Sequence, residues 1–327
     1  MILVTGGTGF IGSNLVGRLA EDGERVSISD TLGSGDKWRN IARHEIDELL
    51  DPTDLEAFLE RRGDEIEFVF HMGAISSTTV TDADLVADMN LRLSQRIWRW
   101  CVAREVPLVY ASSAATYGDG TQGFEDGDSI EELARLRPLN PYGWSKHAFD
   151  RWVAREVADD RGAPPSWFGL KFFNVYGPNE YHKGDMRSMV AKAFGGAGRA
   201  KPVTLFRSHD PDYADGGQMR DFVYVRDCVD VMTWLRRESP ASGLYNLGTG
   251  KARTWLELMS ALYEAVGEEL RVIWVDTPEE IRNRYQYFTQ ADMAKLREAG
   301  YAEPFTSVEE GVRDYVDRFL TQGDPYR

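Results

Sequence analysis

The chain has only two cysteines, Cys101 and Cys228, which lie far apart and belong to no CxxC pair. Isolated cysteines of this kind pack in a core more often than they bind a metal or form a disulfide. They also fit a reducing compartment. We therefore expect no metal site in this protein.

Runs of basic residues and long apolar stretches are also missing. The chain carries 38 Lys and Arg against 53 Asp and Glu, which gives a net charge of −15, and no run of Lys and Arg reaches five residues. Nucleic acids and anionic membranes bind basic patches, so neither is expected as a partner. No segment approaches the roughly 18 apolar residues of a membrane span, and Met1 leads into a strand without a basic leader. We expect a cytoplasmic protein.

The first 30 residues carry the clearest structural pattern. They predict a strand over 1–5, a glycine-rich turn over 6–12, a helix ending near 23 and a second strand over 25–30. In this context, glycines at positions 6, 9 and 12 let the backbone approach a pyrophosphate, which the free N–H groups at the helix start would bind. The prediction is an α/β protein with a Rossmann-type, doubly wound parallel sheet, and 327 residues allow about two domains.

Two residues near the second strand give conflicting signals about the cofactor. Asp30 stands where an acid binds the adenosine 2′-hydroxyl of NAD. Lys37, a few residues later, could neutralise the 2′-phosphate of NADP. From these residues alone, both cofactors stay open.

Alternating strand and helix patterns continue along the chain. Leu85, Met89, Leu93 and Ile97 repeat every four residues and mark a long helix. The other expected helices cover 51–62, 142–160, 186–194, 254–266, 288–299 and 308–320, and the other expected strands cover 67–71, 107–111, 166–173, 203–206 and 244–247. Ligands bind beyond the carboxyl ends of parallel strands, so Ser113 lies where chemistry is expected. We interpret His71 as a packed strand-end residue and Asn90 as a residue that ties down a neighbouring loop.

Tyr142 and Lys146 form a Tyr-x-x-x-Lys motif at the start of a predicted helix. Residues four apart on a helix share a face. A Lys ammonium beside a phenol favours the phenolate, so we expect the pKa of Tyr142 to be lowered towards neutrality.

The glycine motif, Ser113 and Tyr142-x-x-x-Lys146 together resemble the extended short-chain dehydrogenase/reductase superfamily. Further segments resemble the ADP-L-glycero-D-manno-heptose 6-epimerase family in particular: 76–79, 112–118, 172–178, 182–184, 220–225, 246–250, 284–286 and 288–292. The resemblance implies inversion of carbon 6 of an ADP-linked heptose by a tightly held NADP, with NAD as the alternative, to supply lipopolysaccharide biosynthesis. It also implies a homo-oligomer. The expected partner is a small nucleotide-sugar substrate.

The resemblance assigns two acid/bases, Tyr142 and Lys183, because one rigid group cannot serve both faces of a carbon. Ser113 would hydrogen-bond the reacting oxygen, and Lys146 would hold the nicotinamide ribose and tune Tyr142. Burial and a neighbouring cation would lower the pKa of Lys183. Cofactor contacts would come from Gly6, Gly9, Phe10, Ile11, Gly12, Asp30, Thr31, Lys37, Met72, Gly73, Ala74, Ile75, Ser76, Asn90, Tyr142, Lys146, Val175 and Lys183.

Substrate contacts implied by the resemblance lie mostly in the second half of the chain: Ser113, Asn174, Asp185, Lys192, Phe206, Arg207, Ser208, Arg220 and Tyr285. Arg220 would clamp the diphosphate, since a guanidinium binds phosphate oxygens in a fork. We expect a cofactor domain over 1–173, which also receives about 221–253, and a substrate lobe over 174–220 and 254–327.

The sequence departs from the family pattern at several positions. Some members have Ser at 185, His at 192, Glu-Gly-Ser at 206–208, an acid at 72 and a shorter loop between 208 and 220. Ala114 and Ala115 stand where dehydratases of the superfamily carry Asp-Glu, so we do not expect a dehydratase. Two alternatives stay open: another nucleotide-sugar epimerase or reductase, such as a hexose 4-epimerase, and a non-catalytic NADP-binding regulatory protein.

Overall fold

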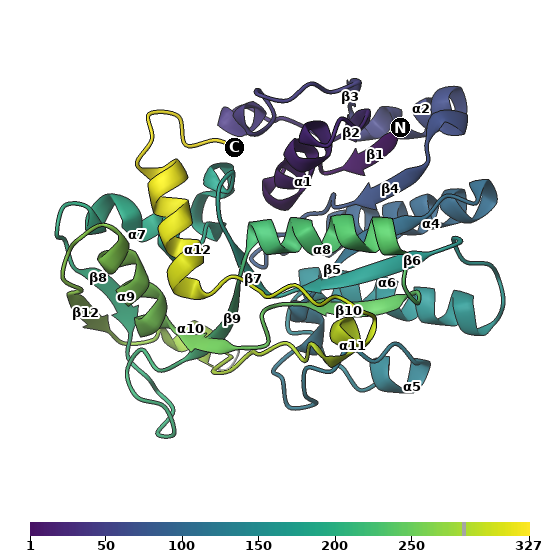
Figure 1. The fold of residues 1–327 in the computed structure, drawn as a ribbon. Helices are drawn as coiled ribbons and strands as arrows, with labels where there is room; N and C mark the ends of the chain where they lie inside the picture. The colour runs from purple at the N-terminus through teal and green to yellow at the C-terminus, as the bar shows by residue number, and fades with distance from the viewer. Residues whose placement is uncertain (283–285) are drawn as a thin grey trace.

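A parallel seven-stranded sheet forms the centre of the computed structural model, which describes residues 1–282 and 286–327 (Figure 1). Its strand order is β10-β6-β5-β4-β1-β2-β3, and every neighbouring pair is parallel. The strands are β1 (Ile2–Thr5), β2 (Val26–Ser29), β3 (Glu48–Leu50), β4 (Phe68–His71), β5 (Leu108–Ser113), β6 (Trp167–Phe172) and β10 (Gly243–Leu247). The predicted Rossmann-type α/β fold is confirmed.

Helices cover both faces of this sheet. Helices α1 (Phe10–Glu21) and α8 (Val225–Glu238) pack together on one face, and α2 (Leu55–Arg62), α4 (Leu93–Arg104) and α6 (Pro141–Ala158) lie on the other (Figure 1). The short helices α3 (Ala83–Val86) and α5 (Ile130–Leu133) contact α6, and α11 (Ala294–Glu298) contacts β10. Because each crossover returns to a parallel strand, all strand carboxyl ends meet at one edge of the sheet.

A second group of elements lies beside that edge (Figure 1). It contains a three-stranded sheet of β11 (Ala252–Thr254), β9 (Met219–Tyr224) and β7 (Asn174–Tyr176), and a pair formed by β12 (Val272–Val275) and β8 (Val203–Phe206). Its helices are α7 (Met189–Ala197), α9 (Trp255–Ala265), α10 (Glu279–Arg282) and α12 (Val308–Tyr315).

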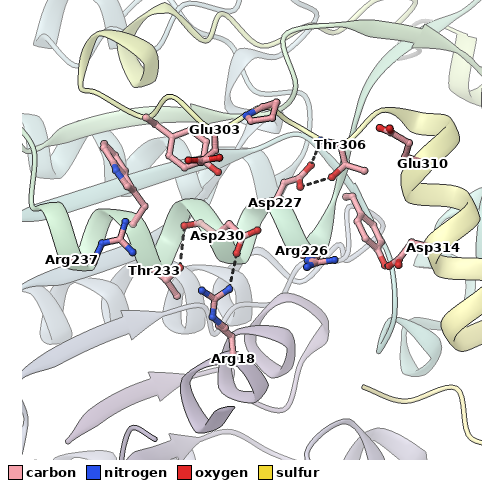
Figure 2. A pocket seen from close by; sticks show the side chains of 14 residues that line it. Arg18, Arg226, Asp227, Asp230, Thr233, Arg237, Glu303, Thr306, Glu310 and Asp314 are labelled. Carbon is pink, nitrogen blue, oxygen red and sulfur yellow. Dashed lines mark hydrogen bonds and ion pairs between the residues drawn. The ribbon is translucent and has the colours of Figure 1, made fainter. Parts of the chain in front are cut away.

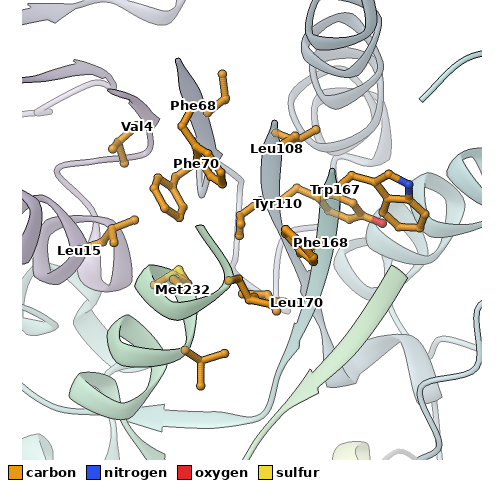
Figure 3. Close-up of a cluster of buried hydrophobic side chains, with 14 of the residues drawn as sticks. Val4, Leu15, Phe68, Phe70, Leu108, Tyr110, Trp167, Phe168, Leu170 and Met232 are labelled. Carbon is orange, nitrogen blue, oxygen red and sulfur yellow. The ribbon is translucent and has the colours of Figure 1, made fainter. Parts of the chain in front are cut away.

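Two clusters of buried side chains hold these parts together. The larger surrounds the seven-stranded sheet and includes Val4, Phe70, Tyr110 and Leu170 (Figure 3). The smaller lies among β9, α9 and α12. Buried side chains between 291 and 301 belong to the larger cluster, although the sequence analysis grouped that segment with the substrate lobe. The predicted division into domains stays a prediction.

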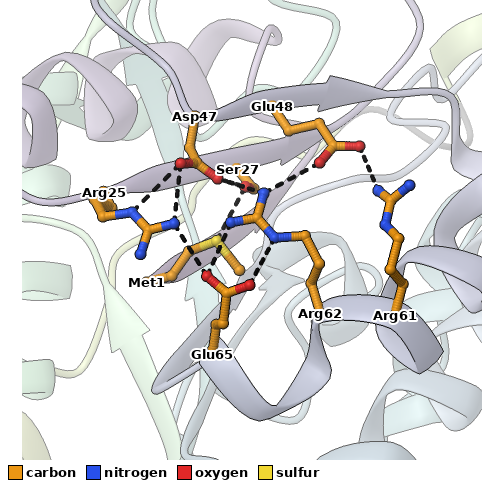
Figure 4. Close-up of polar contacts among 8 residues, drawn as sticks. All are labelled: Met1, Arg25, Ser27, Asp47, Glu48, Arg61, Arg62 and Glu65. Atoms are coloured by element: carbon orange, nitrogen blue, oxygen red, sulfur yellow. Dashed lines mark hydrogen bonds and ion pairs between the residues drawn. The ribbon is translucent and has the colours of Figure 1, made fainter.

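A network of ion pairs closes the opposite edge of the sheet, at the amino ends of the strands (Figure 4). Arg62 binds Asp47 at 2.7 Å and Glu65 at 2.8 Å, and Arg25 binds the same two carboxylates at 3.1 and 3.0 Å. The two guanidinium groups lower the pKa of Glu65 to about 2. All these charges neutralise one another, so this edge has a structural role.

Several predicted elements differ from the observed ones. The expected helix over 288–299 is observed only as α11. The residues before α11 are extended: Ala291 N donates to the Asp221 carboxylate, and the Gln290 side chain accepts from Ala252 N. The strands β3, β7, β9, β11 and β12 were not predicted. Four of them have three or four residues and are too short for a period-two pattern, whereas β9 has six. None of the helices in the described part of the chain has the length and apolar character needed to cross a membrane.

Candidate active site

A cavity of about 340 Å³ opens at the carboxyl ends of β1, β4, β5 and β6. Sixteen predicted site residues line it together: Gly6, Gly9, Phe10, Ile11, Gly12, Asp30, Lys37, Met72, Gly73, Ala74, Ser76, Ser113, Tyr142, Lys146, Val175 and Lys183. Ala111, Ser112, Phe172, Phe173 and His182 complete the wall. Segments far apart in the sequence thus meet where the topology of an open parallel sheet places a ligand.

The glycine turn needs glycine for steric reasons. Gly6 has a φ of +67°, and a Cβ there would meet the backbone of Gly73 at 2.5 Å. A Cβ on Gly12 would lie 2.2 Å from the carbonyl oxygen of Gly6. Gly9 caps α1 without any side-chain hydrogen bond, so the first N–H groups of this helix stay available to an anion. The turn fits the pyrophosphate of a dinucleotide.

Asp30 and Lys37, which gave opposite signals about the cofactor, bind each other. Lys37 Nζ donates to Asp30 Oδ1 at 2.9 Å and to Thr31 O at 2.7 Å. The other carboxylate oxygen of Asp30 accepts from Thr8 N at 3.0 Å and from Thr8 Oγ1 at 2.5 Å. Asp30 is therefore held firmly by the glycine turn, and it holds the Lys37 ammonium at the rim of the cavity.

The segment Asn140–Lys146 is built to bring Tyr142 to the cavity. Asn140 caps α6 by accepting from Gly143 N at 2.8 Å, and Pro141 occupies the first turn, where it needs no N–H donor. A Cβ on Gly143 would lie 2.7 Å from Ala115 O, so glycine lets the helix approach the turn after Ser113. Ser145 Oγ donates to Tyr142 O at 2.7 Å.

Tyr142 is half-buried and hydrogen-bonded to Ser113. Burial raises the pKa of Tyr142, and the bond with Ser113 only partly offsets this effect. Our expectation of a lowered pKa was therefore wrong, because loss of solvation and the Asp150 carboxylate together outweigh the hydrogen bond with Ser113. Lys146 is itself buried, and burial lowers its pKa to about 8. Removal from water therefore favours the neutral form of Lys146, as it favours the neutral form of Tyr142.

A buried ion pair lies behind Lys146. Asp150, one helical turn further along α6, accepts from Lys171 Nζ at 3.1 Å and from Ser112 Oγ at 2.7 Å, and both charged side chains are 0% exposed. Lys171 also donates to Thr116 Oγ1 at 2.8 Å. The Asp150 carboxylate raises the pKa of Lys146 and so opposes the effect of burial.

Lys183 reaches the same cavity from a separate segment, the short 3-10 stretch Tyr181–Met186. Its ammonium lies 5.3 Å from the centre of the Phe10 ring. Burial lowers the pKa of Lys183, as predicted, but the nearby charge is the carboxylate of Glu180, which raises it. The expected neighbouring cation was therefore wrong.

The chain matches the family model of the NAD dependent epimerase/dehydratase family over residues 2–248. This match covers most of the chain and contains the glycine turn, Ser113, Tyr142, Lys146 and Lys183. The chain belongs to this family.

Individual relatives of the epimerase/dehydratase family agree in length and fold. The chain is 48% identical over 331 residues to ADP-L-glycero-D-manno-heptose-6-epimerase of Nitratidesulfovibrio vulgaris, with 100% of both sequences covered. The crystal structure of the Helicobacter pylori enzyme of the same name superposes with a TM-score of 0.78 at 28% identity, covering 98% of this chain and 96% of the other. Thermus thermophilus UDP-glucose 4-epimerase in complex with NAD gives 0.74 at 29% identity, covering 98% and 99%.

In this epimerase/dehydratase chain, Asn90 and His71 have the structural roles that were predicted for them. Asn90 Oδ1 accepts from Ile75 N at 2.8 Å, and its Nδ2 donates to Ile75 O at 3.0 Å and to Ser145 Oγ at 3.0 Å. His71 is buried between Thr5 and Ser94, with ring hydrogen bonds of 2.6 and 2.8 Å. Both structural interpretations are confirmed: Asn90 ties down the loop and His71 packs at a strand end.

Most of the predicted substrate residues lie outside the wall of this cavity. Arg207 pairs with Asp215 at 3.2 Å, and Ser208 N donates to the same carboxylate at 2.8 Å. Arg220 is buried in β9 and donates to Met219 O at 2.8 Å. The predicted substrate residues Asn174, Asp185, Lys192 and Phe206 also lie off the wall, and Tyr285 lies outside the described residues. The predicted cofactor residues Thr31, Ile75 and Asn90 lie off the wall as well. Their assignments as ligand contacts stay predictions.

The five remaining wall residues were not predicted from the sequence. Phe172, Phe173 and His182 belong to motifs that supported the family resemblance, so their position could have been inferred from those motifs. His182 Nδ1 lies 3.2 Å from Asn40 Nδ2, and burial lowers the pKa of His182 to about 4. Its ring is therefore neutral near pH 7.

A larger hollow, about 700 Å³, lies along α8 and contains none of the predicted site residues (Figure 2). Three of its charged side chains are already bound: Arg18 binds Asp230 at 2.7 Å, and Asp227 accepts from Thr306 N at 2.8 Å and Thr306 Oγ1 at 2.7 Å. The predicted site residues come together instead in the smaller cavity at the strand ends.

Proposed function

We propose that the chain inverts carbon 6 of ADP-D-glycero-D-manno-heptose to give ADP-L-glycero-D-manno-heptose, for lipopolysaccharide core biosynthesis. The observation that carries this proposal is that Tyr142 and Lys183, from two separate segments, line one cavity with Ser113. Full-length similarity at 48% identity to a 6-epimerase supports the same substrate.

Inversion needs a proton acceptor and a proton donor at the carbon 6 oxygen, one for each orientation of the sugar. A bound nicotinamide would accept the hydride from carbon 6 and return it to the other face. Lys183, whose pKa burial lowers, takes the hydroxyl proton in one orientation. Tyr142, whose pKa burial raises, gives its proton to the ketone oxygen in the other, and the roles exchange in the reverse reaction. Ser113, bonded to Tyr142, holds the reacting oxygen.

We propose NADP as the cofactor. The Asp30 carboxylate already accepts hydrogen bonds from Thr8, Thr31 and Lys37, which leaves it poorly placed to receive a ribose hydroxyl. The Lys37 ammonium at the cavity rim supplies the positive charge that a 2′-phosphate needs. A cytoplasmic location, a homo-oligomer and the predicted two-domain division belong to the same proposal.

A second candidate is a hexose 4-epimerase, which the fold similarity to Thermus thermophilus UDP-glucose 4-epimerase favours. Such an enzyme manages with one Tyr and rotation of the sugar, and then Lys183 would have no catalytic role. The two candidates therefore differ in what they require of Lys183.

Two substitutions separate the candidates. We expect Tyr142→Phe and Lys183→Met each to abolish epimerisation of ADP-heptose, measured by NMR, while bound nucleotide is retained. Near-full activity of Lys183→Met would rule out the two-base scheme.

A further inference from the structure

Three buried asparagines surround the turn that leads into Lys183. Asn14, Asn40 and Asn179 are 1%, 0% and 0% exposed, and we call them the asparagine cluster. Buried amides are uncommon in proteins unless they are hydrogen-bonded, and the Nδ2 groups of all three form hydrogen bonds. Three such side chains at one point indicate that a defined geometry is maintained there.

Each amide of the asparagine cluster contacts a different segment. Asn14 Nδ2, on α1, donates to Pro178 O at 2.9 Å. Asn40 Nδ2 lies 2.9 Å from Thr8 O in the glycine turn, 3.1 Å from Asn179 O and 3.2 Å from His182 Nδ1. Asn179 Nδ2 donates to Ser13 Oγ on α1 at 3.0 Å and to Asn40 O at 3.3 Å.

The backbone at Asn179 adds a second constraint. Its φ of +72° lies in the left-handed region, where asparagine is tolerated better than other side chains apart from glycine. Its Oδ1 accepts from Arg327 N at 2.9 Å, so a segment distant in sequence also fastens the turn. Residues 178–182 are thus held from several sides, and Lys183 follows directly.

The same contacts reach the adenosine end of the cofactor cavity. Asn40 is the last residue of the short 3-10 helix Asp36–Asn40, which also carries Lys37. Lys37 in turn binds Asp30 at 2.9 Å. Thr8 connects the two ends, because it accepts from Asn40 at its carbonyl oxygen and donates to Asp30 from its N–H. Hydrogen bonds therefore connect Lys37 at the cavity rim with the turn before Lys183.

We propose that Asn40 and Asn179 are positioning residues for Lys183: the asparagine cluster ties the placement of this base to the glycine turn and to the loop of Lys37. This inference rests on the proposed function, in which Lys183 serves one face of carbon 6. It explains why a base from a separate segment can be held in a fixed position against a cofactor bound to the sheet.

Single-turnover oxidation of each ADP-heptose epimer tests this inference. Enzyme loaded with NADP is mixed with one epimer at a time, and the first appearance of reduced nicotinamide is followed by fluorescence. In the two-base scheme, Lys183→Met slows the oxidation of one epimer and Tyr142→Phe slows that of the other. We expect Asn40→Ala to slow the same epimer as Lys183→Met by roughly ten- to a hundredfold, the effect of misplacing a reacting group by about 1 Å.

A second variant and a matched control separate positioning from loss of stability. Asn179→Gly removes the side-chain hydrogen bonds, and glycine tolerates the left-handed backbone. This variant should also oxidise one epimer more slowly, the same one that Lys183→Met slows. Asn246→Ala removes a fully buried amide with three hydrogen bonds far from this turn, so any loss should be shared by both epimers.

The outcomes are distinguishable. Equal slowing of both epimers in Asn40→Ala and Asn179→Gly would overturn the positioning inference and leave the two-base function intact. If Lys183→Met and Tyr142→Phe slow the same epimer, the two-base function itself is wrong, and the positioning inference is wrong with it.

Discussion

Replacement of the buried lysines Lys146 and Lys171 by methionine should change the stability of the protein in opposite directions. Lys146 and Lys171 are 2% and 0% exposed. Lys171 has a carboxylate partner at 3.1 Å, whereas Lys146 makes no hydrogen bond or ion pair within residues 1–282 and 286–327. Methionine has a similar length and carries no charge, so each substitution tests the charge alone.

Burial lowers the pKa of Lys146 from 10.5 to about 8, so the folded protein binds its proton more weakly than the unfolded chain. At pH 7 the corresponding penalty is at most about 3 kcal/mol, since one pKa unit equals about 1.4 kcal/mol. Lys146 faces the cavity, where water reduces this value. We expect Lys146→Met to raise the free energy of unfolding by about 1–3 kcal/mol at pH 7 while abolishing activity.

The destabilising effect of the Lys146 charge depends on pH. Between pH 8 and 10.5 the unfolded chain holds the Lys146 proton more than the folded protein does, so the stability of the wild type rises with pH. The increase in the free energy of unfolding caused by Lys146→Met should therefore be smaller at pH 9 than at pH 7 by about 1 kcal/mol.

Urea unfolding of nucleotide-free protein at both pH values measures these effects. Lys171→Met is the matched control, and it should lower stability by about 3–5 kcal/mol because Asp150 is left buried without its partner. Two results would refute the view that the buried Lys146 charge is destabilising. One is a lower free energy of unfolding for Lys146→Met at pH 7, and the other is an increase at pH 7 that is equally large at pH 9.

Three further predictions concern the cavity wall. Lys37→Ala should weaken NADP binding at least about tenfold and NAD binding much less, as measured by calorimetry, because only NADP carries the 2′-phosphate; equal losses would argue against NADP as the cofactor. Gly6→Ala should prevent cofactor binding, tested by the nucleotide content of the purified protein, because its Cβ would lie 2.5 Å from the Gly73 backbone; normal content would contradict the steric argument. Ser113→Ala should lower kcat by about a hundredfold with little change in KM, since the hydroxyl acts on the developing oxyanion; a change confined to KM would assign it to binding.

The fold and the cofactor half of the site could be predicted because their signals are local. The glycine turn, the strand before it and the helix after it occupy 23 consecutive residues, and their steric needs appear directly as glycines. Tyr142 and Lys146 share one helix. The parallel topology then places these segments and Ser113 at one edge without further information.

Features that depend on contacts between distant segments could not be predicted. The Asp150–Lys171 pair joins α6 to β6, and nothing in either segment indicates its partner. The pKa of Tyr142 depends on burial, which spacing along a helix does not report. The ion pair between Asp30 and Lys37 was missed for another reason: each residue was interpreted only as a ligand contact.

The central claim is that Tyr142 and Lys183 serve opposite faces of carbon 6 in a reaction that returns its own hydride. The most direct measurement is incubation of the purified protein with each ADP-heptose epimer separately, without added cofactor, with stereochemistry followed by NMR. We expect both samples to reach the same mixture of epimers. Protein that contains bound cofactor but leaves each epimer unchanged would contradict the claim.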